Sequence, residues 1–327
     1  MPSPPEPPIH DTLGAVGEGA VLARIFPRLP ASTSELLGPG DDAAVVAAPD
    51  GRFVVTTDMM VHGPDFRLAW SAPHDLGWKA AASNLADVAA MGAVPTALVV
   101  AIAAPADAPV SLLEGIADGL RDACAELAPG CGVVGGDLSV SGTLTIAVTA
   151  FGDLEGREPV LRSGARIGDA VAVAGALGEA AAALRLLFAE AVDAEGHPDA
   201  RLAISLLART APQLAPTPPI SAGRAAAIAG ATAMLDLSDG LAIDSERLAL
   251  ASGVGIDFDS ALLGDDPATA MAGGEDHSLL ATFPPDVALP PPFRRIGTCT
   301  AAGISVDGDP YDPIGWDPYR DWSGSAG

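Results

Sequence analysis

Short apolar runs that end on carboxylates recur along this chain. Three of them end at Asp58, Asp137 and Asp239, in the stretches "VVTTD", "VVGGD" and "AMLDLSD". The alanine-rich stretch 74–91 has an aspartate near its start and Gly92 directly after it, which predicts a helix and its end. Strands that alternate with such helices predict an α/β protein whose acidic side chains lie at the mouths of buried strands.

The chain is too long for one compact domain, since it has 327 residues. A first unit of strands and helices ends near residue 153, and a second begins at 168–191 with a strand, a glycine-rich turn and a long helix. We therefore expect a disordered proline-rich tail over 1–12, an N-terminal domain over 13–153 and a C-terminal α/β domain over 154–327.

Two stretches carry specific local predictions. The runs 43–48 and 52–60 flank a Pro-Asp-Gly turn at 49–51, which predicts a β-hairpin. The proline-rich stretch 211–223, "APQLAPTPPISAG", predicts an extended irregular loop. Between 231 and 301, apolar runs and helical stretches are expected to alternate again.

The charge of the chain excludes two classes of partner. It carries 42 acidic and 17 basic residues, a formal net charge of −25. This is the wrong sign for a nucleic-acid backbone or an anionic membrane surface, so neither is expected to bind. The N-terminal stretch lacks the basic and apolar segments of a leader, and a cytoplasmic location is expected. Three cysteines are expected to stay reduced and to carry no chemistry: Cys124, Cys131 and Cys299.

Eight carboxylates near predicted strand ends are candidate metal ligands. One aspartate at a turn is ordinary, but eight would repel one another unless cations bridge them, and such oxygen ligands suit Mg²⁺, Mn²⁺ or Ca²⁺. Lys79 is the only lysine, which excludes a Walker phosphate loop, and 175–180 lacks the full dinucleotide-binding glycine pattern. Any bound phosphate would then depend on metals, glycine amides and an occasional arginine. The eight are Asp41, Asp42, Asp58, Asp137, Asp236, Asp239, Glu275 and Asp276.

Two further polar residues lie near these motifs. Lys79 falls four residues before Ser83 and eight before Asp87, so the three share one face of the predicted helix, and Lys79 could approach a phosphate or only meet solvent. His277 is expected to be a strand residue at the edge of the site rather than a catalytic base.

Seven motifs occur in order between about residues 14 and 316. With them the chain resembles the thiamine-monophosphate kinases, which share a superfamily with aminoimidazole ribonucleotide synthetase, selenophosphate synthetase and a hydrogenase maturation protein. The resemblance implies an α/β (α+β), two-domain aminoimidazole ribonucleotide synthetase-like fold, with an N-terminal mixed sheet with helices and a C-terminal α/β domain. It also implies a homodimer joined through the N-terminal sheets. The motifs are "GPGDDAAVV", "TTDMMVHG", "KAAASNLADVAAMGAVP", "VVGGD", "RSGARIGD", "LDLSDGLAID" and "GGEDH".

The same resemblance implies an activity. The enzyme would transfer the γ-phosphoryl group of ATP, its co-substrate, to the phosphate of thiamine monophosphate, with several Mg²⁺ ions as cofactors. The products would be thiamine diphosphate and ADP, which makes the chain a kinase of thiamine diphosphate biosynthesis. Such an in-line, metal-assisted transfer depends on positioning and charge neutralisation, so no catalytic side-chain nucleophile or base is required.

The resemblance also assigns site residues, position by position. The metal positions, with Asp41 as part of the same cradle, are Asp41, Asp42, Thr56, Thr57, Asp58, Asp87, Asp137, Asp236 and Asp239. The ATP-binding positions are Gly136, Asp137, Arg162 and Ser238. The positions of the thiamine monophosphate site are Asp65, Glu275 and Trp316.

The departures from the family pattern fall on the acceptor side. Asp65 stands where the family usually has a histidine, and the basic loop "H-R-x-P-x-P" is replaced by "QLAPTPP" at 213–219. Leu138 follows "GGD", and Pro318 follows "GWD". Two alternatives therefore stay open: a paralogue on the same scaffold that uses ATP on a different small-molecule acceptor, and a catalytically silent nucleotide- or metal-binding subunit.

Overall fold

The computed structural model describes residues 11–38 and 44–314. Up to residue 153 the chain forms a four-stranded sheet and a separate two-stranded sheet, β1-β2. The four-stranded sheet has the order β3-β6-β4-β5; β4 and β5 are parallel and the other pairs antiparallel, so the sheet is mixed, as expected. The elements are α1 (Leu13–Val16), α2 (Glu18–Ile25), η1 (Phe26–Arg28), β1 (Glu35–Leu37), β2 (Val45–Val46), β3 (Val54–Val61), α3 (Pro73–Ala90), β4 (Val94–Ala104), α4 (Val110–Leu127), β5 (Gly132–Val140) and β6 (Thr145–Asp153).

The rest of the described chain builds a seven-stranded sheet with the order β13-β12-β9-β11-β7-β10-β8. All neighbouring strands in it are antiparallel except β9 and β12. Its elements are β7 (Ala170–Ala174), α5 (Glu179–Glu190), α6 (Ala200–Ile204), α7 (Leu207–Leu214), α8 (Ile220–Ala229), β8 (Ala233–Leu237), α9 (Leu241–Ser252), β9 (Gly255–Phe258), η2 (Ser260–Leu262), α10 (Pro267–Ala272), β10 (Ser278–Phe283), β11 (Arg294–Thr300), β12 (Ile304–Val306) and β13 (Asp309–Pro310). The predicted strand–turn–helix unit at 168–191 is confirmed as β7 and α5.

Helix α3 begins and ends where its sequence predicts. Pro73 occupies the first turn, where its missing N–H has no partner to lose. Asp75 Oδ2 accepts a hydrogen bond from the amide of Ala72 at 3.0 Å and so caps the start of the helix. Gly92, with a φ of +72°, follows the last turn. The predicted helix over 74–91 is therefore confirmed.

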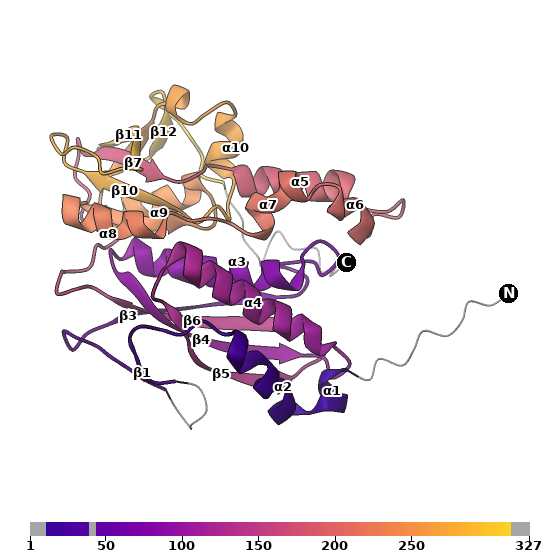
Figure 1. Ribbon diagram of the computed structural model, residues 1–327. Helices are drawn as coiled ribbons and strands as arrows, with labels where there is room; N and C mark the ends of the chain where they lie inside the picture. Colours follow the sequence, from indigo (N-terminus) through magenta and orange to yellow (C-terminus); the bar gives the residue numbers. More distant parts are fainter. Residues whose placement is uncertain (1–10, 39–43, 315–327) are drawn as a thin grey trace.

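The same helix connects the two main sheets. A Cβ on Gly77 would lie 2.0 Å from the carbonyl oxygen of Ile116, so only glycine lets α3 pack this closely against α4. Helix α3 also contacts β3, β4 and β6 of one sheet, β8 and β10 of the other, and α8. In Figure 1, α3 and α4 lie between the two sheets. Side chains on α3 can thus meet residues from both halves of the chain.

Both faces of the seven-stranded sheet are covered. Along β7, Val171 and Val173 pack in an apolar cluster with α9, while Ala172 and Ala174 belong to the larger cluster that includes α3 and α8. This alternation follows from the two-residue period of a strand. The larger cluster continues from α4 through α3 into the second sheet, so the two halves of the chain share one apolar core.

The four-stranded sheet differs, because one of its faces carries exposed apolar side chains. Val55 and Met59 of β3 are 53% and 61% exposed. They alternate with Thr56, whose hydroxyl contacts α3, so they lie on the face that points away from α3.

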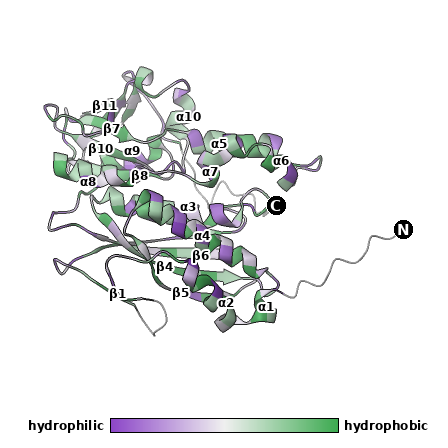
Figure 2. Cartoon of the chain, in the orientation of Figure 1, coloured by the Kyte–Doolittle hydropathy of each residue, from purple (hydrophilic) through white to green (hydrophobic). Residues whose placement is uncertain are grey.

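Figure 2 shows hydrophobic and hydrophilic residues side by side along α4. Within the described residues, no helix combines the length and the apolar character that a membrane crossing requires.

Three local predictions are wrong. The runs 43–48 and 52–60 do not form a hairpin: β2 pairs with β1, and β3 pairs along its whole length with β6. The stretch 211–223 is mostly helical, since α7 continues past Pro212 to Leu214 and α8 begins at Ile220. The alternation of strands and helices after residue 231 ends at α10, since β10 is followed by β11, β12 and β13 with no helix between them.

Candidate active site

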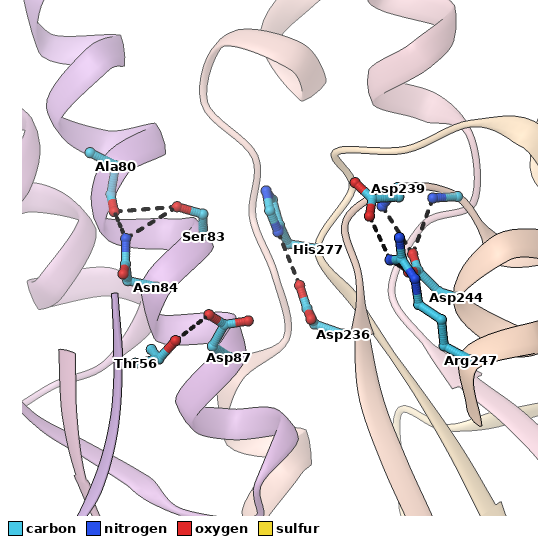
Figure 3. A network of polar contacts seen from close by, with 11 residues as sticks. Thr56, Ala80, Ser83, Asn84, Asp87, Asp236, Asp239, Asp244, Arg247 and His277 are labelled. Carbon is cyan, nitrogen blue, oxygen red and sulfur yellow. Dashed lines mark hydrogen bonds and ion pairs between the residues drawn. The ribbon is translucent and has the colours of Figure 1, made fainter. Parts of the chain in front are cut away.

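Three aspartates from separate elements lie close together beside α3: Asp58 of β3, Asp87 of α3 and Asp236 of β8. We call these three residues the acidic cluster. In Figure 3, Asp87 and Asp236 come from facing elements, with His277 between them. Asp58 and Asp87 belong to the N-terminal half of the chain and Asp236 to the C-terminal half. The cluster therefore lies where the two halves meet.

The carboxylates of the acidic cluster disfavour one another's charge. Burial, together with the charges of Asp236 and Asp58, raises the pKa of Asp87 to about 7. The hydroxyl of Thr56, which donates to Asp87 Oδ2 at 2.8 Å, opposes the shift. Partial desolvation also raises the pKa of Asp58, although its side chain is solvent-exposed, and Asp236 adds to that shift. The backbone amide of Asp58 donates to Asn84 Oδ1 at 3.0 Å. A bound cation would relieve this repulsion.

His277 lies inside the site, directly before β10. Its Nδ1 is 3.3 Å from Asp236 Oδ2, and its side chain is buried. Burial alone would lower the pKa of His277, but the contact with Asp236 raises it. The backbone φ is +50° at His277 and +67° at Glu275, values that residues other than glycine rarely adopt. The prediction of a strand residue at the site's edge is therefore wrong, because this segment turns sharply before the strand begins.

Asp239 is held by residues that the sequence analysis missed. Arg247 Nη1 lies 2.5 Å from Asp239 Oδ2 and 2.6 Å from Asp244 Oδ1 (Figure 3). Asp244 Oδ2 accepts hydrogen bonds from the amides of Asp239 and Gly240 at 2.9 and 3.1 Å, and burial raises its pKa to about 6. The signal was available in the sequence, since Asp244 and Arg247 are spaced three apart in the first turns of α9.

The acidic cluster fits Mg²⁺ by the chemistry of its donors. All three side chains offer carboxylate oxygens, and within the described residues none of them pairs with a lysine or an arginine. Over residues 11–38 and 44–314, no three His, Cys, Asp or Glu side chains converge into a set that could hold one metal ion. Mg²⁺ commonly binds through one or two carboxylates together with water and substrate phosphates, so an all-protein cage is not required.

A second group lies beside the acidic cluster, and we call it the Glu275 corner: Lys79, Gln213 and Glu275. Lys79 is 6% exposed, and its Nζ lies 2.9 Å from Glu275 Oε1. Gln213 Nε2 donates to Glu275 Oε2. Burial alone would raise the pKa of Glu275, but Lys79 and Gln213 lower it, so this carboxylate is ionised. Glu275 also donates its backbone N–H to the carbonyl of Ser238 at 2.7 Å, which ties the corner to the segment after β8.

Asp65 lies near the Glu275 corner. Its Oδ2 accepts a hydrogen bond from the amide of Val61 at 2.7 Å. Burial raises the pKa of Asp65, Glu275 raises it further, and Lys79 opposes the shift. Two positions at which the sequence departs from the family pattern, Asp65 and Gln213, are thus brought together around Glu275. Gln213 was missed as a site residue because 211–223 was expected to be a loop without a fixed position.

The positions assigned to ATP do not all lie together in this chain. Ser238 follows β8, beside the acidic cluster, whereas the backbone carbonyl of Arg162 accepts from Ser252 Oγ at 3.0 Å, near the opposite end of β8. Gly136 and Asp137 lie on β5, at the far edge of the four-stranded sheet. They line a cavity of about 820 Å³ between β5, α2 and α4, and Asp137 Oδ2 accepts from Ser139 Oγ.

Two further predicted positions, Thr57 and Asp276, have their side chains engaged in other contacts. The Thr57 hydroxyl donates to the carbonyl of Val148 on β6, on the face of β3 opposite Thr56, so its side chain points away from the acidic cluster. Asp276 caps the start of α5, where its carboxylate accepts hydrogen bonds from the amides of Gly178 and Ala180. Three predicted positions lie outside the described residues: Asp41, Asp42 and Trp316. Pro318, one of the departures from the family pattern, also lies outside them.

Comparison with known proteins places these features in a family. Residues 40–154 match the family described as AIR synthase related protein, N-terminal domain. A thiamine-monophosphate kinase from Mycobacterium tuberculosis is 43% identical over 328 residues, which cover 95% of this chain and 92% of the relative.

Solved structures agree with the sequence comparison. Thiamine monophosphate kinase from Aquifex aeolicus has a TM-score of 0.70 at 34% identity, covering 81% of this chain and 91% of that chain. The structure of AaThiL complexed with AMPPCP and TMP has a TM-score of 0.68 at 32% identity, covering 92% and 96%. These likenesses confirm the aminoimidazole ribonucleotide synthetase-like fold expected from the motifs. The chain belongs to the thiamine-monophosphate kinase family.

Proposed function

We propose that this chain transfers the γ-phosphoryl group of ATP to thiamine monophosphate, forming thiamine diphosphate and ADP. The observation that carries the proposal is the position of the acidic cluster directly beside the Glu275 corner, in a member of this family. A relative of the same fold is described with AMPPCP, an ATP analogue, and TMP bound together. A cytoplasmic location, expected from the sequence, fits a reaction that consumes ATP.

Mg²⁺ is the metal we propose for the acidic cluster. When bound there, it would neutralise the charge of the two phosphate groups that must approach each other. One or two carboxylates of the acidic cluster would supply oxygen ligands to each ion, and water and substrate phosphates would supply the rest. The hydroxyl of Thr56 fixes the orientation of the Asp87 carboxylate. Arg247 fixes Asp239 in the same way.

The acceptor side needs no catalytic base. The phosphate of thiamine monophosphate is already ionised at neutral pH, so its oxygen can attack without losing a proton to the protein. The chain's own contribution is to hold and align the two substrates. Lys79 serves this role indirectly, since it keeps the Glu275 carboxylate ionised and in place.

A homodimer completes the proposal. Neighbouring strands lie about 4.8 Å apart, so Asp137 on β5 lies three strand spacings, roughly 14 Å, from β3 and its part of the acidic cluster. A second copy packed on the exposed face of β3 would cover Val55 and Met59 and could bring its own β5 near the site. Light scattering tests this directly: the wild type should be a dimer, and Met59→Lys should shift it to a monomer.

An ADP-release assay tests the proposed reaction. Purified protein, ATP and MgCl₂ are combined with and without thiamine monophosphate, and with thiamine as a control. ADP release that requires thiamine monophosphate and yields thiamine diphosphate is the expected result. ATP binding without that requirement would indicate a paralogue with a different acceptor. Nucleotide binding without turnover on any acceptor would indicate a silent subunit.

A further inference from the structure

We propose that Gln213 is a specificity-determining residue, whose side-chain carbonyl oxygen accepts a hydrogen bond from the exocyclic amino group of the acceptor's aminopyrimidine ring. This inference rests on the proposed function and names a residue of the acceptor site that the motifs did not indicate. Gln213 lies in α7, the helix that occupies part of the expected loop, and it is 5% exposed.

The contacts of Gln213 fix the direction of its amide. The Glu275 carboxylate, which also holds Lys79 Nζ at 2.9 Å, is ionised and can only accept hydrogen bonds. The group of Gln213 that faces Glu275 Oε2 must therefore be the NH₂ group. A flipped amide would set two acceptor oxygens against each other. In this arrangement the carbonyl oxygen of Gln213 makes no hydrogen bond to Glu275.

That oxygen has no partner in the described part of the chain. Gln213 Oε1 is buried and makes no hydrogen bond, one of two such side-chain atoms among the described residues. Buried polar atoms are nearly always paired, so an unpaired one requires an explanation, and a ligand group that donates to it would provide one. The other, Ser245 Oγ, is a hydroxyl within α9.

The chemistry of the corner selects the ligand group. An acceptor oxygen beside an ionised carboxylate requires an N–H or O–H donor, and a second carboxylate, Asp65, lies nearby. An aromatic amino group carries two N–H donors in one plane, which matches two neighbouring acceptors, Gln213 Oε1 and the Glu275 carboxylate. Thiamine monophosphate presents such a group on its pyrimidine ring, at the end of the molecule remote from the phosphate.

Discrimination against a substrate that lacks the amino group should follow. A site that pairs a polar ligand group leaves its own buried acceptors unpaired when the group is missing, and this rejects the analogue. We expect wild-type kcat/KM to fall about tenfold to a hundredfold when thiamine monophosphate is replaced by its deamino analogue, with hydrogen in place of the amino group. The loss should appear mainly in KM, because the reacting phosphate is unchanged.

The test compares both substrates on three proteins: wild type, Gln213→Met and Thr210→Val. Methionine keeps the length of glutamine without its polar atoms. The control, Thr210→Val, removes a buried hydrogen bond in the same helix, from the Thr210 hydroxyl to Leu206, and does not touch Glu275. Gln213→Met should reduce the ratio of the two kcat/KM values to near one, while Thr210→Val keeps the wild-type ratio.

Each possible result either supports or overturns the role proposed for Gln213. If Gln213→Met lowers kcat/KM for both substrates by the same factor, Gln213 only supports the fold and the inference is wrong. Equal kcat/KM values for the two substrates on the wild type overturn it without any variant, even if Gln213→Met fails to fold. If the wild type does not convert thiamine monophosphate at all, the proposed function fails together with the inference.

Discussion

The acidic cluster and the Glu275 corner each include one residue of α3, yet their charges are arranged in opposite ways. Asp87 and Lys79 both belong to α3, eight residues and therefore about 12 Å apart along its axis. In the acidic cluster, burial and the neighbouring carboxylates raise the pKa of Asp87. In the Glu275 corner, the only lysine of the chain lowers the pKa of Glu275.

This difference separates two binding tasks. Within the described residues no lysine or arginine pairs with the acidic cluster, which is therefore suited to receive metal ions that in turn would attract phosphates. The Glu275 corner is already neutralised by the protein, so it can recognise a ligand by hydrogen bonds instead of by net charge. The chain thus divides its site into a subsite that depends on added cations and a subsite that does not.

Neutralising the acidic cluster should have the largest effect. Asp58→Asn and Asp236→Asn should each lower kcat by about a thousandfold or more, because the amide is a poor ligand for Mg²⁺ and leaves the phosphates unshielded. Stability should be kept or slightly increased in Asp58→Asn, since the change removes repulsion between carboxylates, whereas Asp236→Asn also weakens the contact with His277. Steady-state kinetics and urea unfolding measure the two effects.

The matched control for these variants is Asp107→Asn. Asp107 is an exposed aspartate in the turn before α4, outside both parts of the site, and its replacement should leave kcat and stability unchanged. Activity near the wild-type level in both Asp58→Asn and Asp236→Asn would rule out the acidic cluster as the metal subsite.

Breaking the Glu275 corner should instead reduce stability. Lys79→Met leaves the half-buried Glu275 without its cation, and we expect a loss of about 3 kcal/mol in the free energy of unfolding. The double variant Lys79→Met/Glu275→Gln should recover part of this loss, because no unpaired charge remains. Urea unfolding of both single variants and of the double variant gives the coupling energy between the two residues.

An exposed ion pair provides the comparison for these Lys79 and Glu275 variants. Arg224 Nε lies 2.5 Å from Glu155 Oε2, and both side chains are open to solvent. Arg224→Met should cost less than about 1 kcal/mol. A loss for Lys79→Met as small as this would mean that the Glu275 corner is no more than another surface pair.

The sequence predicts the parts of the fold that depend on local signals. The cap at Asp75 and the stop at Gly92 define α3 within one or two residues. The hairpin was wrong because the partner of β3 is β6, about 90 residues further along the chain. The loop prediction failed at α7 because packing of that helix against α5 outweighs the proline at 212.

The candidate site likewise has residues that local sequence motifs identify and residues that only tertiary packing brings together. Asp58, Asp87 and Asp236 fall within recognisable motifs, so the sequence finds them. Gln213 and Glu275 are 62 residues apart, and no periodicity or spacing relates them. The sequence accordingly predicts the subsite that depends on added cations better than the subsite that the protein completes by tertiary packing.

Displacing α3 should disturb both parts of the site at once. In Gly77→Ala the new Cβ would meet the carbonyl oxygen of Ile116 at 2.0 Å, which should cost about 2 kcal/mol of stability and move α3 away from α4. The KM values for ATP and for thiamine monophosphate should rise together, since α3 carries a residue of each subsite. Gly142→Ala is the control, because a Cβ there meets nothing within 4 Å. A rise in only one of the two KM values would mean that the subsites are positioned independently of α3.

The smallest effect should come from adding the metal alone. Mg²⁺ at about ten times its dissociation constant should stabilise the folded wild type by about 1.4 kcal/mol, because binding to the folded state relieves the repulsion within the acidic cluster. In a chain of this length that corresponds to a rise in Tm of about 1–4 °C, measured by thermal unfolding without nucleotide. Asp87→Asn should lose most of the rise, whereas Gln213→Met should keep it in full. An equal rise in both variants would place the metal elsewhere and remove the distinction between the two subsites.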